Sequence, residues 1–149
     1  MQSLYLQLLF NAHMKVFRKL AQYFLGATLI YTGTLHLTSS RLEFRAQVPD
    51  WLPLSADFVV LASGIVEITL GLLLIFLWRY YELVGIVTAL FFLAIFPGNI
   101  SQWLNNIDAF GLDSDRARFI RLFFQPLLII WALWSTGAWG RLRRRQKNK

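Results

Sequence analysis

The chain has 149 residues, of which 56% are hydrophobic and 15% are charged. A soluble domain usually carries about 25% charged residues, so this composition excludes an ordinary water-soluble fold. The length allows one domain, and long apolar stretches separate the charged residues, as in membrane proteins. The sequence has no cysteine, which excludes disulfides, thiol redox chemistry and cysteine-ligated clusters within it.

Polar residues also recur at helical spacing before the first long apolar stretch: Ser3, Gln7, Asn11, Lys15 and Arg18. Apolar side chains cover most of the remaining surface of this segment, which predicts a short N-terminal helix lying in the membrane interface. Alternatively, Met14 begins an ordinary cytoplasmic start, and the preceding residues are an upstream extension. The sequence leaves the choice between Met1 and Met14 open.

Four apolar stretches are long enough to cross a membrane. Residues 20–40, 83–107 and 122–140 contain no Asp, Glu, Lys or Arg, and residues 58–78 contain one such residue, Glu67. About 20 helical residues cross the hydrocarbon layer, where backbone amides must bond within their own segment. We therefore predict an all-α integral membrane protein, a four-transmembrane-helix bundle in which residues 1–149 form a single membrane domain. The predicted spans are about 20–40, 57–78, 83–104 and 118–139.

The distribution of Lys and Arg predicts the orientation of these spans. With four spans, ten of the 15 basic residues share the side of both termini, and five lie on the other side. Because basic loops stay in the cytoplasm, we expect both termini to be cytoplasmic, in a bacterial inner membrane. The basic tail is expected to rest on anionic lipid, so the positive charge requires no nucleic-acid partner.

The first outer loop contains Pro49, Trp51 and Pro53. The two prolines exclude a regular helix and stiffen the loop. Trp51 is either an anchor at the headgroup level or, together with the prolines, part of a lid over an outward-facing pocket. In the third span, Pro97 and Gly98 are expected to kink or unwind the helix and to place Asn99 at the break.

Glu67 is the strongest functional candidate because a charge near the middle of a span is costly. Gly64, Glu67 and Gly71 share one helical face, and glycines allow another backbone to approach closely. Glu67 is therefore predicted to face the bundle. It either locks helices together through a hydrogen bond or serves as a carboxyl that exchanges protons or binds a ligand.

Further polar side chains fall at a similar outer level in the other spans. They are His36, which shares a face with Gly33, and Asn99, Arg121 and Gln125. Each one alone can be explained by helix packing, whereas together they predict a polar, outward-facing cavity with Glu67 deeper inside. No His or Cys cluster has the spacing of metal ligands, so no metal site is predicted.

Five motifs occur in order between about Phe24 and Trp134: Gly33-x-x-His36-Leu37, Val48-Pro49-x-Trp51-Leu52-Pro53, Ser63-Gly64-x-x-Glu67-x-x-x-Gly71, Phe96-Pro97-Gly98-Asn99-Ile100 and Arg121-Leu122-x-x-Gln125. With these motifs the sequence resembles the DoxX-like membrane proteins, although Gly98 stands where that family often has alanine. The resemblance implies a small four-helix membrane protein. Members include quinone-linked thiosulfate oxidation subunits, components of membrane oxidative-stress assemblies and chaperones of channel assembly, so it does not select one function.

Three functions remain open. The first is an accessory subunit that assembles, stabilises or anchors a larger membrane complex, which short loops and the lack of a cofactor motif favour. The second is a redox-linked subunit that binds a quinone in the cavity, with Glu67 or His36 moving protons and electrons supplied from elsewhere. The third is a small-molecule or lipid transporter that oligomerises. The expected partners are membrane lipid and other membrane subunits or further copies of the chain. The sequence identifies no cofactor, and the candidate ligand is a quinone or a lipid. The chain alone is not expected to be an enzyme.

Overall fold

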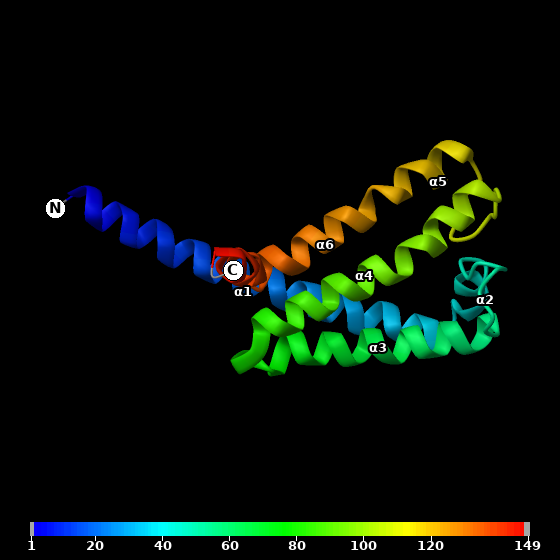
Figure 1. Cartoon of the computed structure of the whole chain (residues 1–149), viewed down its shortest axis with the longest axis horizontal. Coiled ribbons are helices and arrows are strands. Elements are labelled where there is room, and N and C mark those ends of the chain that lie inside the picture. The colour runs from blue at the N-terminus through cyan, green and yellow to red at the C-terminus, as the bar shows by residue number, and fades with distance from the viewer. Residues whose placement is uncertain (1, 148–149) are drawn as a thin grey trace.

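The computed structural model describes residues 2–147, which form helices joined by turns and loops, without a strand (Figure 1). The elements are α1 (Gln2–Leu37), α2 (Arg41–Arg45), α3 (Ala56–Phe76), the 3-10 turn η1 (Trp78–Tyr80), α4 (Tyr81–Leu104), α5 (Asp115–Leu122), α6 (Phe124–Ser135) and α7 (Ala138–Lys147). α3 begins with a capping hydrogen bond, in which the hydroxyl of Ser55 accepts from the amide of Phe58. The short turn η1 makes α3 and α4 a helical hairpin.

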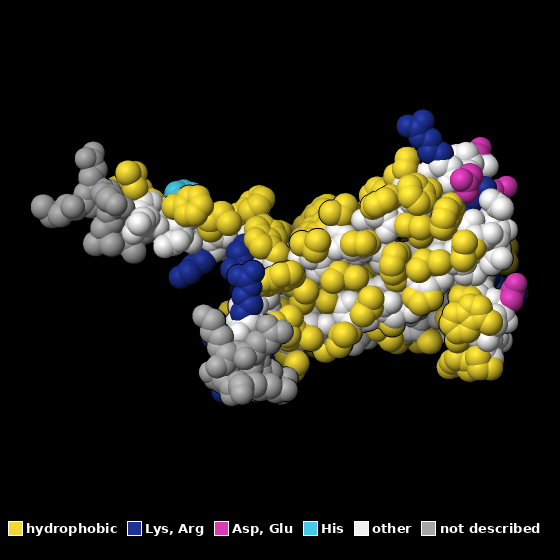
Figure 2. Space-filling model, turned by 45° about the horizontal axis from the view of Figure 1, so that its top comes forward, with side chains coloured by type: hydrophobic (Ala, Val, Ile, Leu, Met, Phe, Trp, Pro, Cys, Tyr) yellow, Lys and Arg dark blue, Asp and Glu magenta, His cyan; other side chains and the backbone are white. Residues whose placement is uncertain are grey.

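Three helices of the described chain are long and apolar enough to cross a membrane: Ala56–Phe76, Trp78–Leu104 and Asp115–Ser135. The most apolar 18-residue stretches of these three helices have mean hydropathies of 2.4, 2.2 and 1.4, respectively. Apolar side chains cover most of the body of the molecule in Figure 2, whereas charged side chains gather near its ends. Such a surface suits lipid and not water. The prediction of an all-helical chain is therefore confirmed, and three of its helices suit a membrane by length and composition.

Two helix pairs make the largest contacts, α1 with α3 and α4 with α6. The α1–α3 contact is built on glycines that meet in pairs, Gly26 with Gly71 and Gly33 with Gly64. A β-carbon on Gly71 would lie 2.5 Å from the carbonyl oxygen of Gly26, and one on Gly33 would lie 2.6 Å from that of Gly64. Within each helix the two glycines are seven residues apart, which is about two turns, so both lie on one face. The sequence therefore brings the two backbones into direct contact.

Apolar side chains from the long helices fill the interior beside this contact. The buried cluster consists of Leu25, Leu29, Leu70, Leu74, Val84, Ala89, Phe92 and Ala132. Because it contains residues of α1, α3, α4 and α6, it holds the two helix pairs together.

The N-terminal segment differs from the prediction. A separate interfacial helix before the first span is wrong, because α1 is continuous from Gln2 to Leu37. No glycine or proline occurs before Gly26 to interrupt it. Its first turns project beyond the other helices (Figure 1).

The helix breaks also lie elsewhere than predicted. Pro97 lies inside α4, which continues to Leu104, so this helix is not unwound at Asn99. The last predicted span, 118–139, is instead divided at Phe123, between α5 and α6. Pro126 explains this break because it has no amide hydrogen to donate to the carbonyl of Leu122. α6 then ends at Ser135, where Gly137 adopts a positive φ of 72°, as glycines commonly do after a helix.

The glycine contact predicts that even one methyl group at Gly71 destabilises the protein. We expect Gly71→Ala to lower the free energy of unfolding by about 1–3 kcal/mol, because the methyl group forces α1 and α3 apart. Thermal melting in mild detergent measures this change. Gly140→Ala is the matched control, since a β-carbon there would meet no atom closer than 3.7 Å. An unchanged melting temperature for Gly71→Ala would mean that the two backbones are not in contact.

Candidate functional site

A cavity of about 320 Å³ lies among α1, α3, α4, α6 and the segment that joins α1 to α3. Most of its wall is apolar, and the polar candidates predicted from the sequence all line it: His36, Glu67, Asn99, Arg121 and Gln125. Residues from the five helices α1, α3, α4, α5 and α6 are thus brought to one space. A concave, mainly apolar site with a few convergent polar groups is typical of small-molecule binding sites, whose volumes start at about 300 Å³.

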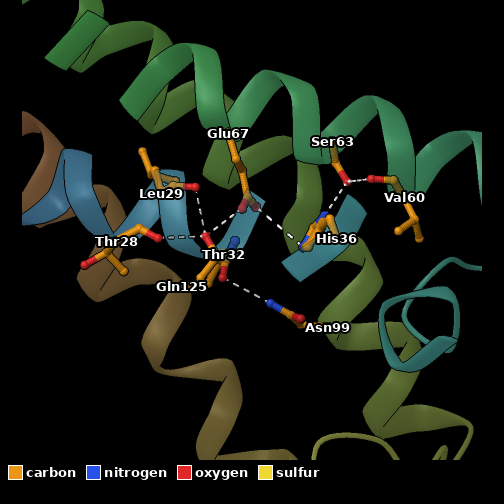
Figure 3. Close-up of polar contacts among 9 residues, drawn as sticks. All are labelled: Thr28, Leu29, Thr32, His36, Val60, Ser63, Glu67, Asn99 and Gln125. Atoms are coloured by element: carbon orange, nitrogen blue, oxygen red, sulfur yellow. Dashed lines mark hydrogen bonds and ion pairs between the residues drawn. The ribbon is translucent and has the colours of Figure 1, made fainter. Parts of the chain in front are cut away.

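Glu67 lies near the middle of α3 and is 5% exposed. Its Oε2 atom lies 2.7 Å from the hydroxyl of Thr32 on α1 (Figure 3). The same hydroxyl lies 3.0 Å from the carbonyl oxygen of Thr28, and it has one hydrogen to donate. An ionised Glu67 accepts that hydrogen, whereas a neutral Glu67 donates its own to Thr32, which then donates to Thr28. Rotation of one hydroxyl therefore accommodates both protonation states.

His36 stands one turn of α1 from Thr32, and its Nε2 atom lies 3.9 Å from Oε1 of Glu67. Its Nδ1 atom lies 3.0 Å from the hydroxyl of Ser63, which donates to the carbonyl of Val60 at 2.9 Å (Figure 3). Since that hydroxyl hydrogen is used, Nδ1 carries the hydrogen of the imidazole–serine bond. The other nitrogen, Nε2, is then directed toward Glu67. The ring of Phe44 from α2 packs on His36 with centroids 3.5 Å apart.

Asn99 and Gln125 form the second polar group of the cavity. The amide of Asn99 on α4 donates to Oε1 of Gln125 at 3.1 Å (Figure 3). Gln125 in turn donates to the carbonyl of Phe92 at 2.8 Å, in the turn of α4 before Pro97. Both side chains are buried. This bond network joins α4 to α6 and explains why Asn99 faces inward although α4 does not unwind.

The segment between α1 and α3 covers one end of the cavity. Pro49 and Trp51 line the space, whereas Pro53 is not part of its lining. The side chain of Gln47 donates to Gln102 of α4 at 3.0 Å. A β-carbon on Gly98 would lie 2.5 Å from the carbonyl oxygen of Gln47, so glycine lets the segment rest on α4. Arg41 of α2 also pairs with Asp57 of α3.

Arg121 enters the cavity wall from α5, close to the break at Phe123. Its guanidinium carbon lies 5.1 Å from the centre of the Phe110 ring. The neighbouring Arg118 has a different role, since it pairs with Asp108 and donates to Asn106 at 3.1 Å. Arg118 therefore fixes the loop between α4 and α5, and Arg121 remains directed toward the cavity.

Several site residues were not predicted from the sequence. Thr28 and Thr32 precede the predicted His36 by eight and four residues, and Ser63 precedes the predicted Glu67 by four. This spacing places them on shared helical faces and was a usable signal. Gln47 gave no such signal, because its contact with Gln102 depends on the path of an irregular segment. Among the described residues, no group of three or more His, Asp or Glu side chains is arranged to hold a metal ion.

The fold and the cavity define a class of protein. It is a small all-helical membrane protein whose helices enclose a space that resembles a ligand-binding site. The chain belongs to the family described as "Domain of unknown function (DUF8561)", whose profile matches residues 25–136. This range includes every polar residue of the cavity named above. No curated protein and no solved structure matches the chain.

The contact between Gln47 and Gly98 predicts that Gly98→Ala loosens the cover of the cavity. A single cysteine in place of Val59, which lines the cavity, would report this by its rate of maleimide labelling in detergent. We expect about fivefold faster labelling, as for a change of about 1 kcal/mol in an opening equilibrium. A cysteine at Leu54, which is exposed and outside the cavity lining, should label equally fast with or without Gly98→Ala. Equal rates at Val59 would show that Gly98 does not hold the segment.

Proposed function

We propose that this protein is a DoxX-like membrane subunit that binds a quinone, or a similar lipid-soluble ligand with a polar ring, in the cavity. The observation that carries the proposal is the convergence of His36, Glu67, Asn99, Arg121 and Gln125 on one mainly apolar space. Apolar walls suit a ring and tail, and the polar groups suit the carbonyl oxygens of a quinone.

The two polar groups of the cavity offer complementary chemistry to such a ligand. Glu67 and His36 form one group, in which Glu67 presents a donor when neutral and an acceptor when ionised, and Nε2 of the neutral His36 presents an acceptor. Asn99 and Gln125 form the other, and each amide keeps a second hydrogen beyond the bond described above. A ligand that gives a proton to Glu67 or takes one from it changes the protonation state of Glu67, and rotation of the Thr32 hydroxyl accommodates this change. Electrons would come from a partner protein, because quinone reduction needs a reductant.

A fourth span within α1, over about residues 20–37, is part of this proposal. Polar residues lower the hydropathy of this segment, and three of them bond to α3. Gln22 is buried and donates to the carbonyl of Leu74 at 2.6 Å, while Thr32 and His36 contact α3. The close contact of α1 with α3 along both glycine pairs favours a position of α1 within the same membrane layer.

A binding experiment with the purified protein tests the quinone proposal. We expect a short-tailed benzoquinone to bind in mild detergent and Glu67→Leu to weaken binding about tenfold, which corresponds to about one hydrogen bond to a polar group. Glu67→Gln should bind nearly normally, since it keeps the shape and a donor. Thr69→Leu, on an exposed face of the same helix, is the matched control. The absence of saturable binding to the unmodified protein, or normal binding by Glu67→Leu, would refute the proposal.

An accessory role in a larger complex is the second candidate, and the projecting part of α1 favours it. Near the start of α1, Tyr5, Leu6 and Phe10 are each more than half exposed. The first turns of α1 project beyond the other helices (Figure 1), where another membrane protein has access to them. Deletion of residues 1–13 should then abolish co-purification with a partner while the melting temperature of the remaining protein stays unchanged.

We further propose that both termini are cytoplasmic, in a bacterial inner membrane, on the basis of the ten-to-five distribution of basic residues. The absence of cysteine makes single-cysteine labelling straightforward. In intact cells, cysteines at the exposed positions Asp50 and Asp113 should react with an impermeant maleimide. A cysteine at Tyr80, also exposed, should react after permeabilisation only. The reverse pattern would place the termini outside.

A further inference from the structure

A second space, separate from the quinone site proposed above, lies between α4 and the pair α5 and α6. Its volume is about 530 Å³. The lining residues are Asn99, Leu112, Ala117, Ile120, Arg121, Phe124, Gln125 and Leu128. Ile120 and Phe124 are 48% and 59% exposed, so the space is an open groove on the outer face of these helices. Asn99, Arg121 and Gln125 form a wall shared by the groove and the cavity.

Arg121 differs from the other arginines that are not fully exposed. Arg18 donates to the carbonyl of Trp134, Arg41 pairs with Asp57, and Arg118 pairs with Asp108. Among the described residues, no carboxylate lies within ion-pair distance of Arg121, and its buried Nε atom has no hydrogen-bond partner. Its guanidinium carbon contacts the ring of Phe110.

A half-buried guanidinium whose Nε atom has no acceptor is costly, because the lost contacts of that atom with water are not replaced. An anion at the groove would supply the missing charge-assisted hydrogen bonds, and the planar guanidinium suits two oxygens of one phosphate or carboxylate. The apolar remainder of the groove would be covered by a hydrocarbon chain. An anionic headgroup joined to an acyl chain combines both features.

We propose that this groove binds one anionic membrane lipid, whose headgroup phosphate contacts Arg121 and whose acyl chain lies along α4, α5 and α6. The lipid is bound from the surrounding bilayer, since the groove opens on an apolar outer face. The occupant of this site is distinct from the ligand of the cavity, although Asn99 and Gln125 lie between the two.

Native mass spectrometry of the protein in neutral detergent tests the site with defined lipids. Phosphatidylglycerol should be retained about tenfold more strongly than phosphatidylcholine with the same acyl chains. Arg121→Gln should abolish this preference. Arg116→Gln removes the same charge from an exposed position of the same helix and should preserve it. Ala117→Trp, which fills the groove and keeps Arg121, should reduce retention of both lipids.

The contrary outcomes are equally specific. Equal retention of the two lipids by the unmodified protein, or an unchanged preference in Arg121→Gln, would overturn the proposal. Inorganic phosphate that displaces phosphatidylglycerol as effectively as a second anionic lipid would also overturn it, because the acyl chain would then contribute nothing.

A benzoquinone titration of Ala117→Trp separates the two sites. Loss of lipid with normal quinone binding supports the groove, and failure of quinone binding alone leaves the lipid result standing.

Discussion

The direct contact of two backbones at the glycine pairs of α1 and α3 determines the rest of the site. A β-carbon on Gly64 would lie 2.7 Å from the β-carbon of His36, and one on Gly33 would lie 3.0 Å from that of Glu67. The same glycines therefore set the distance between helices and the separation of the two ionisable side chains. With bulkier residues at these positions, Thr32 and Glu67 could not bond across the interface at 2.7 Å. Packing and polar chemistry thus share one contact surface.

Long-range periodicity in the sequence was sufficient to predict the helical membrane fold, the glycine face and the inward position of Glu67. It also placed four polar candidates at a similar outer level and Glu67 deeper, because helical rise converts residue number into depth. Periodicity could not predict the irregular features, which are the helix break at Phe123 and the path of the segment between α1 and α3. A kink or break was expected at Pro97, whereas α4 continues past Pro97 and the division falls at Phe123, near Pro126. The carbonyl that loses its amide donor is that of Leu93 for Pro97 and that of Leu122 for Pro126, and periodicity does not distinguish these two positions.

The polar residues of the cavity differ in their chemistry as well as in their depth. Those of α1 and α3 form local networks with short relays of hydroxyl groups, which are suited to changes of protonation. In the cavity wall, α4 and α6 contribute the amides Asn99 and Gln125, whose bonds do not depend on protonation state. Arg121 adds a fixed charge at the boundary between the cavity and the outer groove. One small set of helices therefore presents three kinds of polar environment within a mainly apolar interior.

The buried polar face of α1 also bears on how the protein is made. In the proposed four-span arrangement, Gln22, Thr32 and His36 find their partners on α3, which is synthesised later. When α1 first reaches the membrane, these side chains have no protein partner, and their desolvation opposes stable insertion. Insertion of α1 should then be completed only when α3 emerges and the two helices meet as a pair. The biogenesis machinery would have to retain α1 during that interval, so translation speed through residues 38–76 becomes a determinant of correct assembly.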